Sequence, residues 1–328
     1  MSKPKVFVTR VILDSGLRLV QDFCDLDLWT DELPPPRDVL LERVHGVEGL
    51  LCLLTDRIDG EVMDAAGPQL KVISNHAVGY DNIAVPEATA RRIPVGNTPG
   101  ILTDATADLT FALLLAAARR VVEAERFVRQ GMWKTWQPAL LLGVDVAGAT
   151  LGIVGYGRIG QAVARRATGF GMRILYYDPF AAPVPSIPAQ PVDFATLLRE
   201  ADFVSLHTPL TDETYHLINA QTLALMKTTA VLINTSRGPV VDNQALYAAL
   251  KARRIFAAAL DVTDPEPLPM NSPLLELENI IILPHIASAS RSSRENMSRM
   301  AAENLIAGLK GERLPHCVNP EVYDLLSA

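Results

Sequence analysis

The chain contains little cysteine and no long apolar segment. Its 3 cysteines lie far apart and share no metal-ligand spacing, so we expect reduced thiols. The longest notable apolar run, from Phe111 to Ala118, is far too short to span a bilayer. The N-terminal residues show no signal-peptide core, because a strand-like stretch begins at Val6. We therefore expect a cytoplasmic protein that does not cross a membrane.

Basic residues are also few. Lys and Arg number 30 against 37 Asp and Glu, which gives a net charge of −7. Because nucleic acids and anionic membranes bind basic faces, we expect neither as a partner. The 6 histidines form no set with metal-ligand spacing, and no metal site is expected. The length of 328 residues and the 49% hydrophobic content predict two globular domains.

A short apolar strand followed by a helix-like segment recurs along the chain, which is typical of parallel α/β folds. The pattern occurs in two blocks, and the second has six strands, as in a complete dinucleotide-binding fold. The predicted strands are Lys5–Thr9, Leu26–Trp29, Gly49–Cys52, Lys71–Ser74 and Pro94–Val95, then Thr150–Val154, Arg173–Tyr177, Phe203–Leu206, Val231–Asn234, Ala257–Leu260 and Ile280–Leu283.

Two segments stand out from this alternation. A long helical pattern begins near Thr103 and runs towards Gly131. The residues from 132 to 142 include two tryptophans and three leucines, which favours a surface covered by another element or subunit. Four prolines lie between Ala181 and Pro191, so we expect a stiff extended loop there in place of a helix.

A G-x-G-x-x-G sequence follows the strand that ends at Val154. Gly155 allows a tight turn, Gly157 allows a pyrophosphate to approach the backbone, and Gly160 lets the helix pack on the strand. The helix N-terminus adds N–H groups and partial positive charge. A glycine turn without a ligand is the alternative, but the second strand is followed at the expected distance by an acid, Asp178.

Asp178 indicates whether the dinucleotide is NAD(H) or NADP(H). A carboxylate at this place accepts hydrogen bonds from the ribose hydroxyls and repels a 2′-phosphate. The residues that follow, Pro179 to Ala182, include no cation. We therefore expect NAD(H) as the preferred cofactor, with NADP(H) possible. The alternative for Asp178 is a solvated turn residue before proline.

Polar residues follow each of the last three predicted strands, where open α/β sheets bind ligands. Arg237 can hold a carboxylate through paired hydrogen bonds, and His285 can exchange a proton with a carbonyl oxygen. Glu266 can orient the imidazole, and Asp261 is placed to contact the nicotinamide carboxamide. Each residue alone could be structural, but together they predict a reducing site for a 2-keto acid.

The order of these motifs resembles that of the D-isomer-specific 2-hydroxyacid dehydrogenase family. The motifs are G-x-G-x-x-G, an acid after the second strand, N-T-S-R-G, D-V-x-x-x-E-P and P-H-I-x-S. The segments His76–Asn82 and Asn97–Gly100 also resemble this family and, within it, glyoxylate/hydroxypyruvate reductases. The resemblance covers essentially the whole chain.

The resemblance implies an α/β fold of two lobes with the active site between them. One lobe is a Rossmann doubly wound parallel-sheet cofactor domain, expected at residues 101–286. The other is a smaller flavodoxin-like α/β substrate domain, expected at residues 1–100 plus 287–328. Residues 101–145 are expected to form a dimerisation arm, which predicts a homodimer.

The same resemblance assigns roles to individual residues. His285 is the acid/base catalyst, Glu266 tunes it, and Arg237 binds the substrate. The expected cofactor-binding residues are Gly155, Gly157, Arg158, Ile159, Gly160, Asp178, His207, Thr208, Pro209, Thr235, Ser236, Asp261, Ser288 and Thr103.

Further substrate contacts are implied outside these motifs. The backbone N–H groups of Val78 and Gly79 are expected against the substrate carboxylate. Leu54 is expected to line the pocket, and Trp136 to reach into the neighbouring subunit's site. Two departures from the family pattern are Ala287, where glycine is common after His-Ile, and the proline-rich stretch after Asp178.

The sequence thus predicts an NAD(P)-dependent reductase of a small 2-keto acid, glyoxylate or hydroxypyruvate, that gives the D-isomer where the product is chiral. Two alternatives stay open. One is a regulatory protein that senses NAD(H) without turnover, since a fold does not fix an activity. The other is a reductase of a bulkier acid such as 2-ketogluconate.

Overall fold

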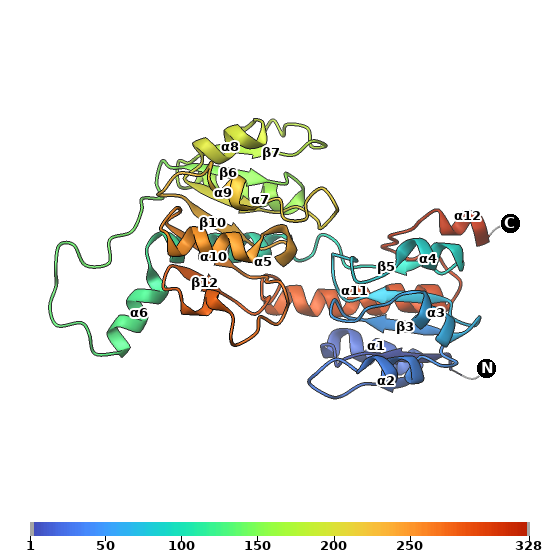
Figure 1. Ribbon diagram of the computed structural model, residues 1–328. Helices are drawn as coiled ribbons and strands as arrows, with labels where there is room; N and C mark the ends of the chain where they lie inside the picture. Colours follow the sequence, from blue (N-terminus) through green and yellow to red (C-terminus); the bar gives the residue numbers. More distant parts are fainter. Residues whose placement is uncertain (1–2, 327–328) are drawn as a thin grey trace. The chain divides into compact units, whose positions relative to one another are not determined.

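The computed structural model describes residues 3–326, which divide into two compact units. The first unit combines Met1–Leu102 with Ala289–Ala328, and the second is Thr103–Ser288. Each unit has its own parallel sheet with helices on both faces (Figure 1). All eleven predicted strands occur, with their ends shifted by at most one residue.

The first unit is built on a five-stranded sheet. Its strands are β1 (Lys5–Val8), β2 (Asp25–Leu28), β3 (Gly49–Cys52), β4 (Val72–Asn75) and β5 (Val95–Gly96). They are parallel and lie in the order β2-β1-β3-β4-β5. This is the flavodoxin-like order, which confirms the fold predicted for the smaller lobe.

Successive residues of a strand point to opposite faces of the sheet. Here both faces carry buried apolar side chains, and helices cover both. They are α1 (Asp14–Phe23), α2 (Arg37–Arg43), α3 (Gly60–Ala66), α4 (Val85–Ala90), α11 (Arg291–Leu309) and α12 (Val322–Leu326). Val6 and Val8 pack with α1 and α11, whereas Phe7 and Leu50 pack with α2, α3 and α4.

The long helix α11, near the end of the chain, joins the first unit through a close contact with α1. A Cβ at Gly16 of α1 would lie 2.1 Å from the carbonyl oxygen of Ser298 in α11. The backbones can approach this closely only because Gly16 has no side chain. The end of the chain therefore completes the core of the unit in which the chain begins.

The second unit is built on a seven-stranded parallel sheet. Its strands are β6 (Thr150–Val154), β7 (Arg173–Tyr177), β8 (Ala189–Pro191), β9 (Phe203–Leu206), β10 (Val231–Asn234), β11 (Ala257–Leu260) and β12 (Ile280–Ile282). The order is β12-β11-β10-β9-β6-β7-β8. The chain leaves β6 in one direction for β7 and β8, and in the other for β9 to β12, which is the Rossmann topology.

Two helical layers enclose this sheet. The helices are α5 (Thr103–Ala118), α7 (Arg158–Thr168), α8 (Phe194–Glu200), α9 (Ala220–Leu223) and α10 (Asn243–Lys251). On the face of α5 and α7, Phe111 packs with Ile153 and Ile233. On the face of α8 to α10, Leu197 packs with Val204 and other strand residues. The alternation of these side chains along the strands produces the two cores.

The proline-rich stretch departs from the sequence prediction at its C-terminal end. No helix lies between β7 and β8 in this described segment, as expected, but Ala189–Pro191 form a strand that was predicted as loop. Pro191 pairs with Tyr176. Proline fits a parallel sheet only at its edge, where the missing N–H costs no ladder bond. The strand β8 is that edge, so the sheet has seven strands where the sequence predicted six.

The long helix predicted from Thr103 towards Gly131 is broken in two. α5 ends at Ala118, Arg120 adopts a left-handed φ of 52°, and α6 (Val121–Arg129) follows. The Ala118 carbonyl accepts a hydrogen bond from Val144 N at 2.9 Å. This tertiary contact competes with continuation of the helix, and helical periodicity in the sequence carries no sign of it.

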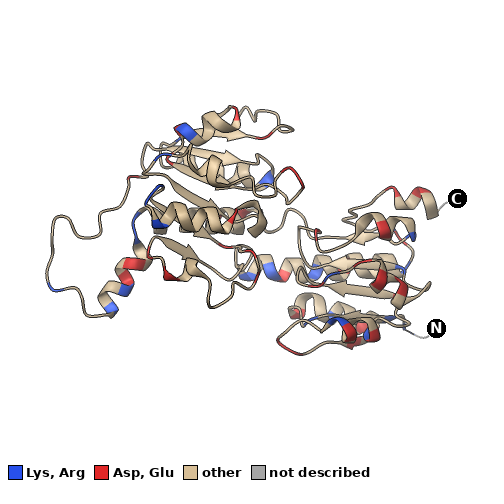
Figure 2. Cartoon of the chain, in the orientation of Figure 1, with Lys and Arg blue, Asp and Glu red and all other residues tan. Residues whose placement is uncertain are grey.

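The segment from α6 to residue 142 stands away from the sheet of its unit (Figure 1). α6 has no buried residue among those described, and its acidic residues precede its basic ones along the helix (Figure 2). Large apolar side chains here are more than half exposed: Val121, Val128, Met132, Trp133, Trp136 and Leu142.

The described residues contain neither a membrane-spanning helix nor a cluster of metal ligands. No helix within residues 3–326 is long and apolar enough to cross a membrane. No group of three or more His, Cys, Asp or Glu in that range could hold a metal ion.

Candidate active site

Three neighbouring strands of the second unit end at the same edge of the sheet. β10, β11 and β12 are parallel and adjacent. Arg237 follows β10, Glu266 follows β11 and His285 follows β12. Ligands of open α/β sheets bind at this carboxyl edge, so the topology gathers the three predicted reactive residues where a ligand is expected.

His285 and Glu266 form a short hydrogen bond. The Nδ1 atom of His285 lies 2.5 Å from Oε1 of Glu266. An ionised carboxylate can only accept, so Nδ1 carries the hydrogen and Nε2 is left to exchange a proton with a ligand. The side chains are 23% and 36% exposed, so the pair is accessible from solvent. The arrangement is that of an oriented general acid/base.

Asp261 fixes the backbone around His285. Its Oδ1 and Oδ2 accept the N–H groups of Ile286 at 2.8 Å and Ala287 at 2.7 Å, and its carbonyl accepts His285 N at 2.9 Å. His285 has a φ of 54°, a left-handed conformation that is uncommon outside glycine. Burial raises the pKa of the Asp261 carboxyl, while the two N–H donors act in the opposite direction.

The structure shows a contact of Asp261 that the sequence did not predict. Its side chain is 0% exposed and lies against the turn that carries His285. Its contact with the nicotinamide carboxamide stays a prediction. The residue types alone gave no indication that this carboxylate would support the turn that carries His285.

Asn234, which the sequence prediction missed as a site residue, shapes the turn that presents Arg237. Its Oδ1 accepts from Ser236 N at 3.0 Å and Ser236 Oγ at 2.8 Å, and its Nδ2 donates to the Arg237 carbonyl at 2.9 Å. Asn commonly forms such turns, so Asn234 at the start of N-T-S-R-G was a usable signal. Next to it, a Cβ at Gly238 would lie 1.9 Å from Thr263 O, so the Arg237 and Glu266 loops meet by close backbone contact.

The glycine turn has the geometry of a phosphate-binding loop. Gly155 has a φ of 90°, and a Cβ there would lie 2.7 Å from the backbone of His207. A Cβ at Gly160 would lie 2.2 Å from Gly155 O. At Gly157 a Cβ would meet nothing within 4 Å, so the space next to its backbone is open. Arg158 and Ile159 begin α7, whose N-terminus faces this turn.

Asp178 joins the glycine turn to the loop after β7. Its Oδ2 accepts from Tyr156 N at 2.8 Å, and its Oδ1 accepts from Phe180 N at 2.8 Å and Ala181 N at 3.1 Å. Val154 and Tyr177 are register partners, so β6 and β7 bring Asp178 beside Gly155. The residue is partly exposed, and Oδ2, which accepts only one of these hydrogen bonds, retains a lone pair for a ligand.

Two polar atoms after β9 fit a bound ligand. His207 Nε2 pairs with Ser205 Oγ at 2.8 Å, and burial lowers the pKa of His207 to about 3, which keeps it neutral. Within the described residues, His207 Nδ1 and Thr208 Oγ1 are buried without a hydrogen-bond partner. Such atoms usually have a ligand or water as partner. With the open space at Gly157, they fit a dinucleotide along β6 and β9.

The remaining predicted residues are dispersed. Thr235 Oγ1 pairs with Thr110 Oγ1 of α5 at 3.0 Å, and Thr103 begins that helix. Pro209 is exposed and Ser288 is the last residue of the second unit. Leu54, Val78 and Gly79 belong to the first unit, and Trp136 is 77% exposed in the segment that follows α6.

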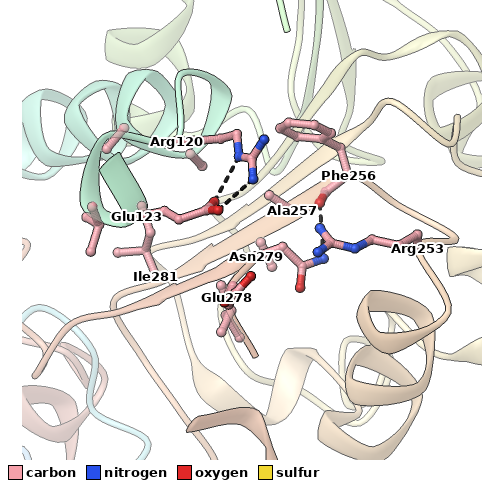
Figure 3. A pocket seen from close by; sticks show the side chains of 13 residues that line it. Arg120, Glu123, Arg253, Phe256, Ala257, Glu278, Asn279 and Ile281 are labelled. Atoms are coloured by element: carbon pink, nitrogen blue, oxygen red, sulfur yellow. Dashed lines mark hydrogen bonds and ion pairs between the residues drawn. The ribbon is translucent and has the colours of Figure 1, made fainter. Parts of the chain in front are cut away.

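A small cavity in the second unit lies away from these residues. Its volume is about 30 Å³, and its lining includes Arg120, Glu123, Asn279 and Ile281 (Figure 3). It borders the first residues of β11 and β12, whereas His285 follows the last residue of β12. Arg120 and Glu123 pair with each other at 2.5 Å. The cavity has room for about one water molecule and is not the candidate active site.

Known proteins match this chain over nearly its full length. Residues 111–287 match the family described as D-isomer specific 2-hydroxyacid dehydrogenase, NAD binding domain. A glyoxylate reductase of Korarchaeum cryptofilum is 57% identical over 323 residues, 98% of this chain and 97% of the relative. A glyoxylate reductase of Thermococcus litoralis is 54% identical over 98% of each chain.

Solved structures agree with these sequence matches. The crystal structure of a Thermus thermophilus protein has a TM-score of 0.90 and 50% identity, covering 96% of this chain and 99% of the other. An NADPH-dependent glyoxylate/hydroxypyruvate reductase from Sinorhizobium meliloti, solved with NADP and malonate, has a TM-score of 0.87 and 32% identity, covering 97% and 98%. This chain belongs to the D-isomer-specific 2-hydroxyacid dehydrogenase family of nicotinamide-dependent oxidoreductases.

Proposed function

We propose that this protein reduces glyoxylate, and hydroxypyruvate as a second small 2-keto acid, to the corresponding 2-hydroxy acid, as the D-isomer where the product is chiral. The observation that carries the proposal is the hydrogen-bonded His285–Glu266 pair at the strand edge where Arg237 also lies. The similarity to glyoxylate reductases at 57% and 54% identity supports the choice of substrate.

Each reactive residue has one task in this proposal. Arg237 holds the substrate carboxylate and polarises the adjacent carbonyl through charge-assisted hydrogen bonds. His285 gives the Nε2 proton to the carbonyl oxygen as it becomes a hydroxyl, while Glu266 keeps the ring oriented through Nδ1. A bound reduced nicotinamide supplies the hydride for the keto carbon. In the first unit, Val78 and Gly79 offer N–H groups to the substrate carboxylate, and Leu54 lines the pocket.

The proposed cofactor is NAD(H) in preference to NADP(H). Asp178 places a carboxylate beside the glycine turn, where a 2′-phosphate would be repelled. No Lys or Arg lies between Asp178 and Ala189 in the sequence. The relative from Sinorhizobium meliloti is NADPH-dependent, and comparing NADH with NADPH in the assay tests the preference of this chain.

We assign the cofactor to the second unit and substrate binding mainly to the first. We further propose a homodimer formed through α6 and the segment up to residue 142, with Trp136 contributing to the partner's site. The support is the exposed apolar set on that segment, including Trp133 at 60% and Trp136 at 77%.

Nicotinamide absorbance of the purified protein tests the proposal. NADH or NADPH is mixed with glyoxylate, hydroxypyruvate, pyruvate or 2-ketogluconate, and the specificity constants are compared. Fastest oxidation of NADH by glyoxylate or hydroxypyruvate is the expected result. Preference for 2-ketogluconate would contradict the small-substrate assignment. Tight NADH binding without turnover of any acid would favour the sensor instead.

A further inference from the structure

The loop after β4 presents two successive peptide groups whose orientations are fixed by hydrogen bonds. The Ala77 carbonyl accepts Thr98 N at 2.8 Å, and the Val78 carbonyl accepts Asn97 Nδ2 at 2.8 Å. In a trans peptide the carbonyl of one residue points opposite to the N–H of the next. These two bonds therefore set the directions of the Val78 and Gly79 N–H groups.

Those two N–H groups are available for a ligand. Among the residues that the structure describes, neither Val78 N nor Gly79 N donates a hydrogen bond. Both residues are partly exposed. Adjacent unpaired N–H groups form an anion-binding concavity when their directions are fixed.

Asn97 is itself held firmly. Its backbone N–H donates to His316 O at 3.2 Å, and its carbonyl accepts from Asn304 Nδ2 at 2.9 Å. Asn304 is fully buried in α11. The side-chain amide that reaches the Val78 carbonyl therefore starts from a rigid backbone, anchored on the C-terminal part of the first unit.

The side-chain amides of Asn75 and Asn82 connect the loop after β4 to the loop after β3. Asn75 Nδ2 donates to Gly79 O at 2.9 Å and to Asn82 Oδ1 at 3.0 Å. Asn82 Nδ2 in turn donates to the carbonyls of Leu53 and Asp56, both at 3.0 Å. Leu54 lies between these two carbonyls in the chain. The loops after β3 and β4 are thus joined through asparagine side chains.

We propose that Asn97 is a positioning residue for substrate binding, which fixes the Gly79 N–H for the carboxylate of a 2-keto acid. Asn82 acts in the same way at longer range, by fixing the Leu54 loop against the loop of Val78 and Gly79. This inference rests on the proposed function for the identity of the substrate. It assigns Asn97 and Asn82 no contact with substrate or cofactor.

The kinetic test compares Asn97→Ala and Asn82→Ala with a matched control. Asn279 is part-buried in the second unit and also donates to two backbone carbonyls, Leu250 O at 3.2 Å and Phe256 O at 3.1 Å. Misplaced binding groups are costly, so we expect the glyoxylate KM of Asn97→Ala to rise about tenfold or more. The KM for NADH is expected to stay within about twofold, and Asn279→Ala to change neither constant.

Thermal unfolding separates positioning from stability. Each of the three alanine variants loses hydrogen bonds and is expected to unfold at a somewhat lower temperature than the unmodified chain. Only the two loop variants are expected to show the selective rise in glyoxylate KM. Asn97→Leu, which fills the space without a donor, is expected to match Asn97→Ala. Unchanged glyoxylate KM in both Asn97 variants would overturn the proposal.

Oxalate binding tests the same claim without turnover. The unmodified protein and Asn279→Ala, loaded with NADH, are expected to be stabilised equally by oxalate, and Asn97→Ala much less. This result would support the positioning role even if glyoxylate were not reduced, in which case only the proposed function fails. Equal stabilisation of all variants, or none of the unmodified protein, would contradict the positioning role.

Discussion

The Nδ1 atom of His285 lies 2.5 Å from Oε1 of Glu266, while the backbone of the same histidine is held by Asp261. The side chain is thus oriented from the end of β11 through Glu266, and the turn is fixed from the same strand end through Asp261. The left-handed φ of 54° persists because these contacts determine it. Both constraints leave Nε2 as the ring atom available to a substrate.

Replacing His285 by Asn is expected to lower kcat by about 10²–10⁴-fold, because the general acid is lost. Asn tolerates a left-handed φ better than Ala does, so His285→Asn is expected to retain the native turn. NADH binding, measured by fluorescence titration, is expected to stay unchanged. A variant that keeps the full rate would remove His285 from the proposed chemistry.

Glu266→Gln is expected to lower kcat by about 10²-fold, because a neutral amide no longer gives the imidazole a charge-assisted partner. The amide can also donate to Nδ1, which would leave the imidazole neutral and make His285 a weaker proton donor. Steady-state kinetics with saturating NADH measures the loss. A similar variant of an acid on the same loop, Asp264→Asn, is the control and is expected to retain most of the rate.

Much of the fold and of the reactive set could be predicted from the sequence because the signals are local. Apolar runs such as Val231–Asn234 mark buried parallel strands, and the G-x-G-x-x-G spacing marks a turn that few other residues can form. Arg237, Glu266 and His285 each follow such a run, and parallel topology then brings strand ends to one edge.

The parts that the sequence did not predict depend on contacts between distant residues. The break at Arg120 accompanies a hydrogen bond between Ala118 and Val144, and β8 forms because β7 offers an unpaired edge to a proline-containing segment. Asp261 was predicted from its residue type as a cofactor contact, but its burial against the His285 turn follows from the tertiary fold. Neither the secondary-structure propensity of a residue nor the spacing of a motif indicates which distant residues will be in contact.

The glycine turn offers a test that separates ligand binding from folding. A Cβ at Gly157 meets nothing within 4 Å, so Gly157→Ala is expected to fold normally but to raise the NADH KM by about tenfold or more through contact with the pyrophosphate. Gly155→Ala has to adopt a φ of 90° and meets the His207 backbone, so it is expected to lose about 1–3 kcal/mol of stability. Thermal unfolding and NADH titration of both variants measure the two effects. Unaltered NADH binding in Gly157→Ala would argue against a dinucleotide at this turn.

Asp178→Asn is expected to relax the preference for NADH over NADPH. The amide keeps the size of the side chain, and its oxygen can still accept from Phe180 N and Ala181 N, whereas Tyr156 N loses its acceptor. The repulsion of a 2′-phosphate is removed with the charge. The ratio of kcat/KM for the two cofactors measures the change. If the unmodified protein already prefers NADPH, the assignment of NAD(H) is wrong.

His76 makes the stability of the first unit depend on pH. Its ring lies 3.0 Å from Ser298 Oγ, and burial, together with the nearby Arg294 charge, lowers its pKa from 6.5 to about 4. The unfolded chain therefore binds a proton at a higher pH than the folded chain does. The stabilisation is complete above pH 6.5 and is lost as the pH falls towards 4, by at most about 1.4 kcal/mol per pH unit.

His76→Gln is expected to lose this part of the pH dependence, since glutamine has no proton to gain. Denaturant unfolding at several pH values between 7 and 4 compares the variant with the unmodified chain, and the difference between the two slopes isolates His76 from the other titrating groups. The control is His45→Gln, at a histidine exposed to solvent, which is expected to keep the original slope. Equal slopes for His76→Gln and the unmodified chain would mean that the buried ring contributes no acid sensitivity.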